Sequence, residues 1–107
     1  MTKDEWQSLY DDLDRVYTDF LLAYPEYENG RNKKIREAGR RKVDNAINSA
    51  SYFIRKNGDA YKLLTGGEGN SDFGRTIAYD EFIQPRYFRN DMGVFLRKIK
   101  EGIQNLS

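Results

Sequence analysis

Residues 6–24 read WQSLYDDLDRVYTDFLLAY, and this stretch decides the fold class. Its apolar side chains recur every three or four residues from Trp6 to Tyr24. At about 100° per residue they occupy one face of a helix, and polar side chains occupy the other. The preceding Thr2-Lys3-Asp4-Glu5 has the pattern of a capping box, which predicts where the helix begins. We therefore predict an amphipathic helix over about 3–24, ended by Pro25.

A second amphipathic stretch follows Asn29-Gly30 and covers residues 32–56. Its apolar stripe begins with small side chains and ends with bulky ones, and consists of Ile35, Gly39, Val43, Ala46, Ala50, Phe53 and Ile54. The small members would allow a neighbouring helix to approach closely. Because the connector is short, we expect the helices over 3–24 and 32–56 to form an antiparallel hairpin.

The rest of the chain predicts shorter elements and one more long helix. Residues 57–59 have the capping residues that end the second helix and begin a short one. Residues 65–76 hold four glycines without periodicity, which predicts a mobile loop. A C-terminal helix is expected over about 90–106, capped by Asn90. The prediction is one all-α domain over 1–107: the hairpin, the C-terminal helix and one or two short helices.

Composition removes several classes of function. The 107 residues include no cysteine and no histidine. This excludes disulfides, thiolate nucleophiles, histidine-bearing zinc sites and Ser-His-Asp triads. Apolar stretches stay far below the roughly 20 residues of a membrane span, and the first residues lack the apolar region of a signal peptide. We expect a cytoplasmic, non-enzymatic protein with no cofactor, no metal site and no membrane contact.

The charges are arranged in blocks along the chain. Residues 1–30 carry two bases and eight acids, whereas residues 31–56 carry nine bases and two acids. Glu5, Asp12 and Asp19 are spaced by seven, so they line one flank of the first helix. These acids could meet Lys34 and Arg41 across the hairpin, as charges do beside the seam of a coiled coil. Under this interpretation the two blocks neutralise each other.

An alternative is that the basic block binds a phosphate-bearing ligand, either nucleic acid or a nucleotide. Arginine and lysine bind phosphate, and an aromatic ring beside them can stack on a base. The candidate phosphate-binding residues are Lys33, Lys34, Arg36, Arg40, Arg41 and Tyr52.

Aromatic and basic residues also gather around Pro85. Exposed clusters of this kind mark interaction sites, because tyrosine and arginine are favoured anchors at protein interfaces. The candidate partner-binding residues are Tyr79, Phe82, Arg86, Tyr87, Phe88 and Arg89. The alternative is that these aromatic rings fill the core.

Two short segments carry a resemblance. Gly30-Arg31-Asn32-Lys33 opens the second helix, which later reads Asn45-Ala46-Ile47-Asn48. In these segments the chain resembles the helical core of small phage-encoded proteins that sequester cyclic-nucleotide immune signals. The resemblance implies a nucleotide ligand for the basic block, and it assigns no individual site residue.

Together these patterns favour a small intracellular binding protein that acts on a protein partner. Regulators and inhibitors of phages and other mobile elements are of this type. The low apolar content of the chain, 38%, is explained either by a high surface-to-volume ratio or by association with copies of itself, and we expect a homo-oligomer.

Overall fold

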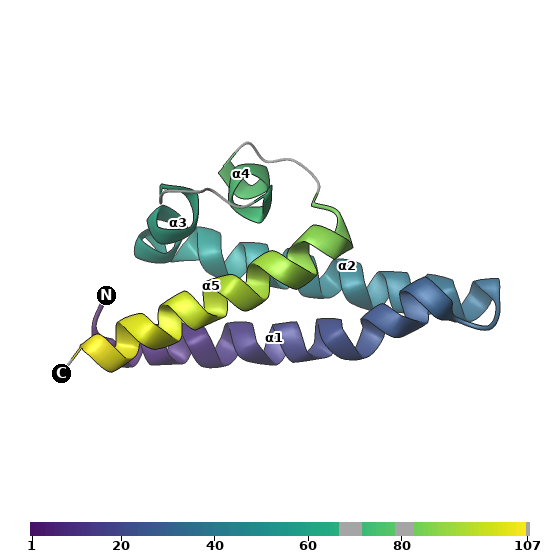
Figure 1. The fold of residues 1–107 in the computed structure, drawn as a ribbon, viewed down its shortest axis with the longest axis horizontal. Coiled ribbons are helices and arrows are strands. Elements are labelled where there is room, and N and C mark those ends of the chain that lie inside the picture. The colour runs from purple at the N-terminus through teal and green to yellow at the C-terminus, as the bar shows by residue number, and fades with distance from the viewer. Residues whose placement is uncertain (67–71, 79–82, 107) are drawn as a thin grey trace.

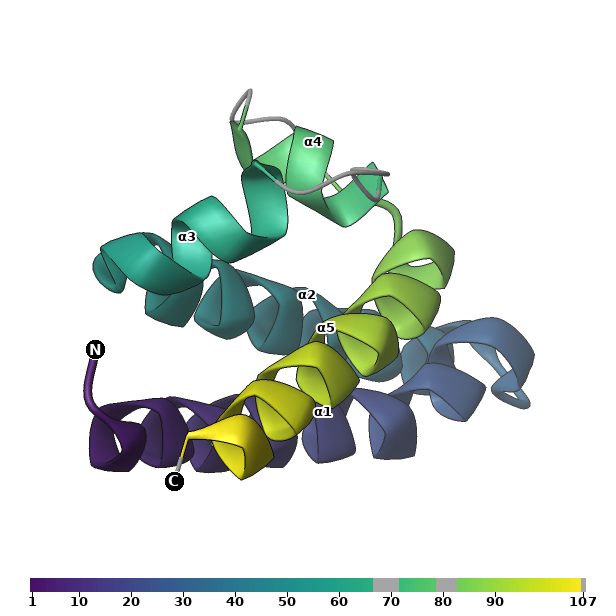
Figure 2. The same ribbon diagram turned by 60° about the vertical axis from the view of Figure 1, so that its left-hand side comes forward.

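The computed structural model describes residues 1–66, 72–78 and 83–106, and these form five helices (Figure 1). The helices are α1 (Lys3–Asn29), α2 (Lys33–Lys56), α3 (Gly58–Thr65), α4 (Asp72–Ala78) and α5 (Pro85–Asn105). The chain is all-α: α1 and α2 pack closely as an antiparallel hairpin, and α5 packs on α1. α5 crosses α1 obliquely, while α3 and α4 lie beyond α2, away from α1 (Figure 2).

The helix α1 begins as predicted and ends later. The Glu5 amide donates to the Thr2 hydroxyl, and the Glu5 carboxylate accepts from the Thr2 amide, which completes a capping box. Pro25 does not end the helix but lies inside it, so the predicted end at residue 24 was wrong. Proline costs the helix one hydrogen bond. The packing of Tyr27 beside Tyr24, with ring centroids 6.0 Å apart, helps to carry the helix past this position.

The helix α2 runs over nearly the predicted range. The Asn32 side chain accepts from the Ile35 amide at 3.0 Å and caps its first turn. Gly39 lies where α2 comes nearest to α1. A Cβ atom at Gly39 would be 2.6 Å from the backbone nitrogen of Tyr27, so only glycine fits without moving a helix. The close approach predicted from the small residues of the stripe is confirmed.

The helix α5 begins earlier than predicted. It starts at Pro85, so Asn90 lies inside the helix and is not its cap. Proline suits the first helical position because its fixed φ is already helical. The N–H that proline lacks would have no partner inside the helix at this position, so its loss costs nothing. The predicted loop of residues 65–76 was wrong at both ends, because Thr65 belongs to α3 with Gly66 as its C-cap, and α4 begins at Asp72. Residues 67–71 of this loop lie outside the described residues.

Aromatic rings tie the second half of the chain to the hairpin. The Phe88 side chain on α5 is fully buried between Phe20 on α1 and Phe73 on α4, with ring centroids 4.8 and 5.1 Å away. These edge-to-face contacts fix where α5 begins relative to the hairpin. Among the described residues, no helix has both the length and the apolar character to cross a membrane.

Candidate protein-binding surface

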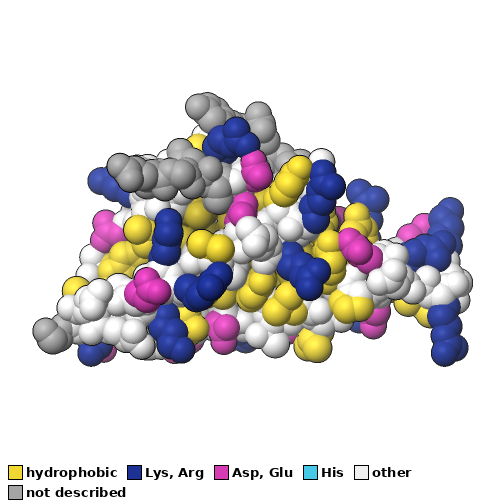
Figure 3. All heavy atoms as spheres, viewed as in Figure 1, with side chains coloured by type: hydrophobic (Ala, Val, Ile, Leu, Met, Phe, Trp, Pro, Cys, Tyr) yellow, Lys and Arg dark blue, Asp and Glu magenta, His cyan; other side chains and the backbone are white. Residues whose placement is uncertain are grey.

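Two contacts with α1 orient the N-terminal half of α5. The Phe88 ring points into the core, and the hydroxyl of Tyr17 donates to the backbone carbonyl of Arg89. Because Phe88 faces inward, its helical neighbours Arg86, Tyr87 and Arg89 face outward, and all three are exposed. Figure 3 shows hydrophobic and basic side chains side by side over this part of the molecule.

The structure therefore divides the predicted partner-binding residues. Arg86, Tyr87 and Arg89 are exposed, and we call these three residues the α5 surface. Phe88 has no exposed side chain and belongs to the core, so it is removed from the set. Tyr79 and Phe82 lie outside the described residues.

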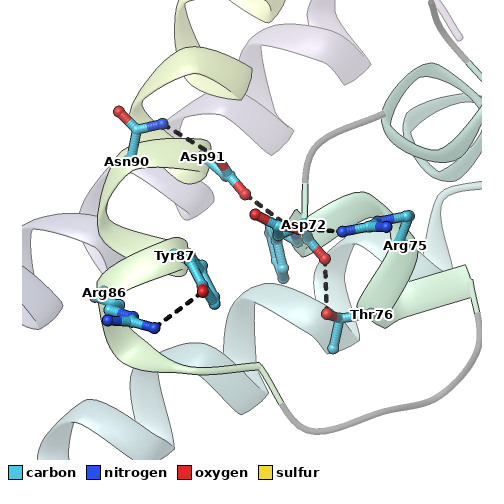
Figure 4. A network of polar contacts seen from close by, with 8 residues as sticks. Asp72, Arg75, Thr76, Arg86, Tyr87, Asn90 and Asp91 are labelled. Carbon is cyan, nitrogen blue, oxygen red and sulfur yellow. Dashed lines mark hydrogen bonds and ion pairs between the residues drawn. The ribbon is translucent and has the colours of Figure 1, made fainter. Parts of the chain in front are cut away.

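The Arg86 guanidinium lies over the Tyr87 ring and hydrogen-bonds to its hydroxyl, as the dashed line in Figure 4 shows. The guanidinium carbon of Arg86 lies 4.8 Å from the centroid of the Tyr87 ring, and its Nη2 donates to the Tyr87 hydroxyl at 3.0 Å. Stacking of this kind limits the rotamers of both side chains. The Tyr87 side chain is still 38% exposed, which leaves a rigid aromatic edge available to a partner.

A pocket of about 190 Å³ lies beside this stack, between the hairpin and the start of α5. We call it the α5 pocket. It is lined by Tyr24, Tyr27, Glu28, Arg40, Asp44, Gln84, Pro85 and Arg86. Two tyrosine rings and two guanidinium groups thus border one hollow, and they come from three different helices.

The acids of the α5 pocket already have partners. The hydroxyl of Tyr24 donates to the Glu28 carboxylate. This hydrogen bond is the main cause that raises the pKa of the Tyr24 phenol, and burial of the side chain is the second. Asp44 is paired with Arg40 at 3.8 Å. The guanidinium of Arg89 lies over the Tyr24 ring, 5.4 Å from its centroid. Arg86 pairs with no acid within the described residues, so the pocket rim offers a guanidinium to an incoming acidic group.

The candidate phosphate-binding residues are not brought together in one site. Arg36 donates to the Gly30 carbonyl at 2.9 Å, and Lys33 is paired with Glu37 at 3.9 Å. Arg40 alone of this set lines the α5 pocket. Tyr52 is 11 residues from Arg41, about 16 Å along α2, and lines a different hollow.

The two charged blocks neutralise each other less than predicted. Lys42 on α2 pairs with Glu26 on α1 at 3.7 Å. However, neither Lys34 nor Arg41 pairs with Glu5, Asp12 or Asp19 within the described part of the chain. The register explains this difference for Lys34, because with Gly39 against the backbone of Glu26 and Tyr27, Lys34 lies beyond the end of α1. That part of the prediction was wrong.

A second concave surface lies on the side of the hairpin away from α5, where the sequence analysis placed no site. It is a groove of about 430 Å³ lined by Val16, Asp19, Leu22, Ala23 and Glu26 of α1 and by Lys42, Asn45, Ala46 and Ser49 of α2. A shallower hollow shares Asn45 and Ser49 with it and extends to Tyr52. We call the two together the hairpin groove. Leu22 and Tyr52 are 72% and 60% exposed beside it.

The described residues contain no group of three or more acidic, histidine or cysteine side chains placed to hold a metal ion. Comparison with models of known families, with curated proteins and with solved structures gave no match.

Proposed function

We propose that this chain is a small, non-enzymatic, cytoplasmic binding protein that recognises a protein partner through the α5 surface and the α5 pocket. In this proposal it acts as a regulator or inhibitor, of the type that phages and other mobile elements encode, and it works as a homo-oligomer.

The observation that carries the proposal is the stacked Arg86–Tyr87 pair at the rim of a pocket walled by Tyr24 and Tyr27. Tyrosine and arginine are the residues most enriched among interface hot spots, and they act best where a pocket excludes water. A pocket of about 190 Å³ is smaller than the roughly 300–1,000 Å³ typical of small-molecule sites. It suits one or two side chains of a protein better than a whole ligand.

The chemistry of the pocket also limits the partner. Arg86 lines the pocket and Arg89 lies 5.4 Å from the ring of Tyr24, while Glu28 and Asp44 are engaged by Tyr24 and Arg40. The side chain that enters should therefore be acidic or aromatic, since a carboxylate can accept two hydrogen bonds from one guanidinium and an aromatic ring can stack on tyrosine.

The test is affinity capture by the tagged chain in extract of the cells that encode it. We expect one protein to bind the wild type at stoichiometric yield and to be lost with the double variant Arg86→Ala and Tyr87→Ala. A matched control, Lys98→Ala with Lys100→Ala, changes two exposed side chains on the C-terminal half of α5 and should bind normally. Equal capture by all three proteins, or no stoichiometric partner, would refute the proposal.

One observation favours a second candidate, a phosphate-bearing ligand. Arg40 of α2 and Arg86 of α5 line the same pocket, although most of the basic set lies elsewhere. Nucleic-acid binding should weaken steeply as salt rises, whereas an interface anchored by aromatic rings should weaken little. A mobility-shift titration at two salt concentrations, and calorimetry of nucleotides with wild type and Arg40→Glu, would separate the two candidates.

A further inference from the structure

We propose that the hairpin groove is filled by the hairpin groove of a second copy of the chain, related by a two-fold axis that runs along the groove. In this dimer α1 of each copy lies over α2 of the other, and the two hairpins form a four-helix bundle. The inference rests on the homo-oligomer of the proposed function and identifies the surface that forms it.

The floor and the rim of the groove are apolar enough to be a contact surface. Val16, Ala23 and Ala46 form its floor, and Leu22 and Tyr52 project beside it. A leucine that is 72% exposed next to a hollow is typical of a side chain that a partner covers. Small side chains in the floor leave room for such a side chain from a facing helix.

The two walls of the groove differ in charge. The wall on α1 carries Asp19 and Glu26. Asp12, which is paired with Arg15 at 3.2 Å, continues the spacing of seven on the same flank of the helix, beyond the residues that line the groove. The wall on α2 carries Lys42, Asn45 and Ser49. Lys56, the last residue of α2, follows Ser49 by seven residues and therefore lies on the same flank of the helix. The ammonium of Lys56 lies 5.9 Å from the Tyr52 ring, which places both beside the groove.

The two walls are nearly in register. The register is set at Gly39, where a Cβ atom would lie 2.6 Å from the Tyr27 backbone nitrogen and 3.0 Å from two atoms of Glu26. Lys42 is three residues further along α2, about 4 Å from the height of Glu26, and its side chain reaches Glu26 at 3.7 Å. Counting seven residues along each helix from this pair gives Asp19 with Ser49, and fourteen gives Asp12 with Lys56, each about 4 Å apart in height. Glu26 and Asp12 thus each have a lysine within reach of their own height on the other wall, and Asp19 has a hydroxyl donor nearby.

Two grooves can face each other symmetrically in two ways. With the two-fold axis across the groove, α1 lies over α1 of the other copy, and acidic wall meets acidic wall. With the axis along the groove, α1 lies over α2, and Asp12, Asp19 and Glu26 of one copy face Lys56, Ser49 and Lys42 of the other. Only the second arrangement is complementary in charge, and like charges set against each other are strongly disfavoured.

This dimer leaves both α5 surfaces free, because they lie on the other side of each hairpin. The assembly would then present two identical partner sites facing outward, so a partner with two binding sites would be held more tightly than by one chain alone.

The first test is the mass in solution, measured by sedimentation over a range of concentrations. We expect the wild type at twice the 12.6 kDa mass of the chain, and Leu22→Asp at the mass of a single chain. The matched control is Leu21→Asp, an exposed leucine on another flank of α1, which should stay dimeric. A wild type that remains a single chain even at the highest soluble concentration, or a Leu22→Asp variant that remains dimeric, would overturn the proposal. If the wild type stays a single chain, the groove would instead be available to a helix of another protein.

The second test checks the direction of the axis. Asp12→Lys and Lys56→Glu should each weaken the dimer at least tenfold, since each sets like charges against each other at two places. Mixing the two variants should restore a heterodimer, because the new ammonium at position 12 of one chain then faces the new carboxylate at position 56 of the other, and the unchanged pair remains. Failure of the mixture to associate would overturn the axis along the groove.

The experiments distinguish failure of the dimer proposal from failure of the proposed function. If Leu22→Asp loses the dimer but still captures the partner through the α5 surface, both stand. If Arg86→Ala with Tyr87→Ala captures as well as wild type while Leu22→Asp dissociates, the proposed function fails and the dimer stands.

Discussion

Replacement of Gly39 by alanine should destabilise the protein, although alanine is the better helix former. In a helix interior alanine is favoured over glycine by about 1 kcal/mol. At Gly39, however, the new Cβ would lie 2.6 Å from the Tyr27 backbone nitrogen and 3.0 Å from two atoms of Glu26. Overpacking costs about 1–3 kcal/mol, and we take the upper end because a helix backbone must move. The net loss is about 2 kcal/mol.

The assay is thermal unfolding by circular dichroism at one fixed protein concentration, since association shifts the midpoint. Gly39→Ala should lower the midpoint by roughly 10 °C, because about 1 kcal/mol corresponds to roughly 4–8 °C in a domain of this size. The matched control is Gly102→Ala on α5, where a Cβ would meet nothing within 4 Å. It should raise the midpoint by a few degrees. A Gly39→Ala variant as stable as wild type would refute the close packing of α1 on α2.

Three further predictions concern how the remaining elements are held. Tyr17→Phe removes the hydroxyl that bonds the backbone of α5 and should cost about 1 kcal/mol in denaturant unfolding. Asp91→Ala removes the carboxylate that accepts from the Phe73 amide at 2.9 Å, so the amides of α4 should exchange faster while those of α1 keep their protection. The Thr2 amide, by donating to the carboxylate, holds the pKa of Glu5 below its ordinary 4.5, so the capping box should stabilise the fold above that pH and lose its effect as the pH falls through the lower folded pKa. A titration by NMR checks this; Thr2→Ala keeps the amide and removes only the hydroxyl, so the pKa of Glu5 should rise only part of the way towards 4.5.

The hairpin could be predicted from sequence because its signals are local. Periodicity, the caps at Thr2 and Asn32 and the small residues of the second stripe all indicate the same arrangement. The two proline positions were misjudged for opposite reasons. Pro25 lies inside a helix whose rings are packed on both sides of it, so tertiary packing outweighs a local preference there. Pro85 begins a helix that was predicted to begin at Asn90, and here the preference of proline for the first helical position was missed.

The candidate site could be predicted only in part. The exposed cluster of Arg86, Tyr87 and Arg89 follows from composition, but composition cannot tell which aromatic ring points inward, and Phe88 is the one that does. The α5 pocket joins residues of α1, α2 and α5, and nothing local in the sequence brings these three helices to one point.

The sequence contains a spacing pattern that marks the hairpin groove, but only part of this pattern entered the sequence analysis. The spacing of seven among the acids continues to Glu26, and a matching spacing runs from Lys42 through Ser49 to Lys56. The register of the two rows depends on where the turn between the helices falls. The structure supplies that register through the contact of Gly39 with the backbone of Glu26 and Tyr27.

The most direct test of the proposed function is site-specific photo-crosslinking in the cells that encode the protein. A photoreactive phenylalanine at position 87 replaces a ring that is 38% exposed, and one at position 100 on the C-terminal half of α5 serves as the control. We predict one adduct of defined mass from position 87, absent from position 100 and lost when Arg86 is also changed to alanine. Adducts of equal yield from both positions, or none from position 87, would contradict the assignment of this surface to a protein partner.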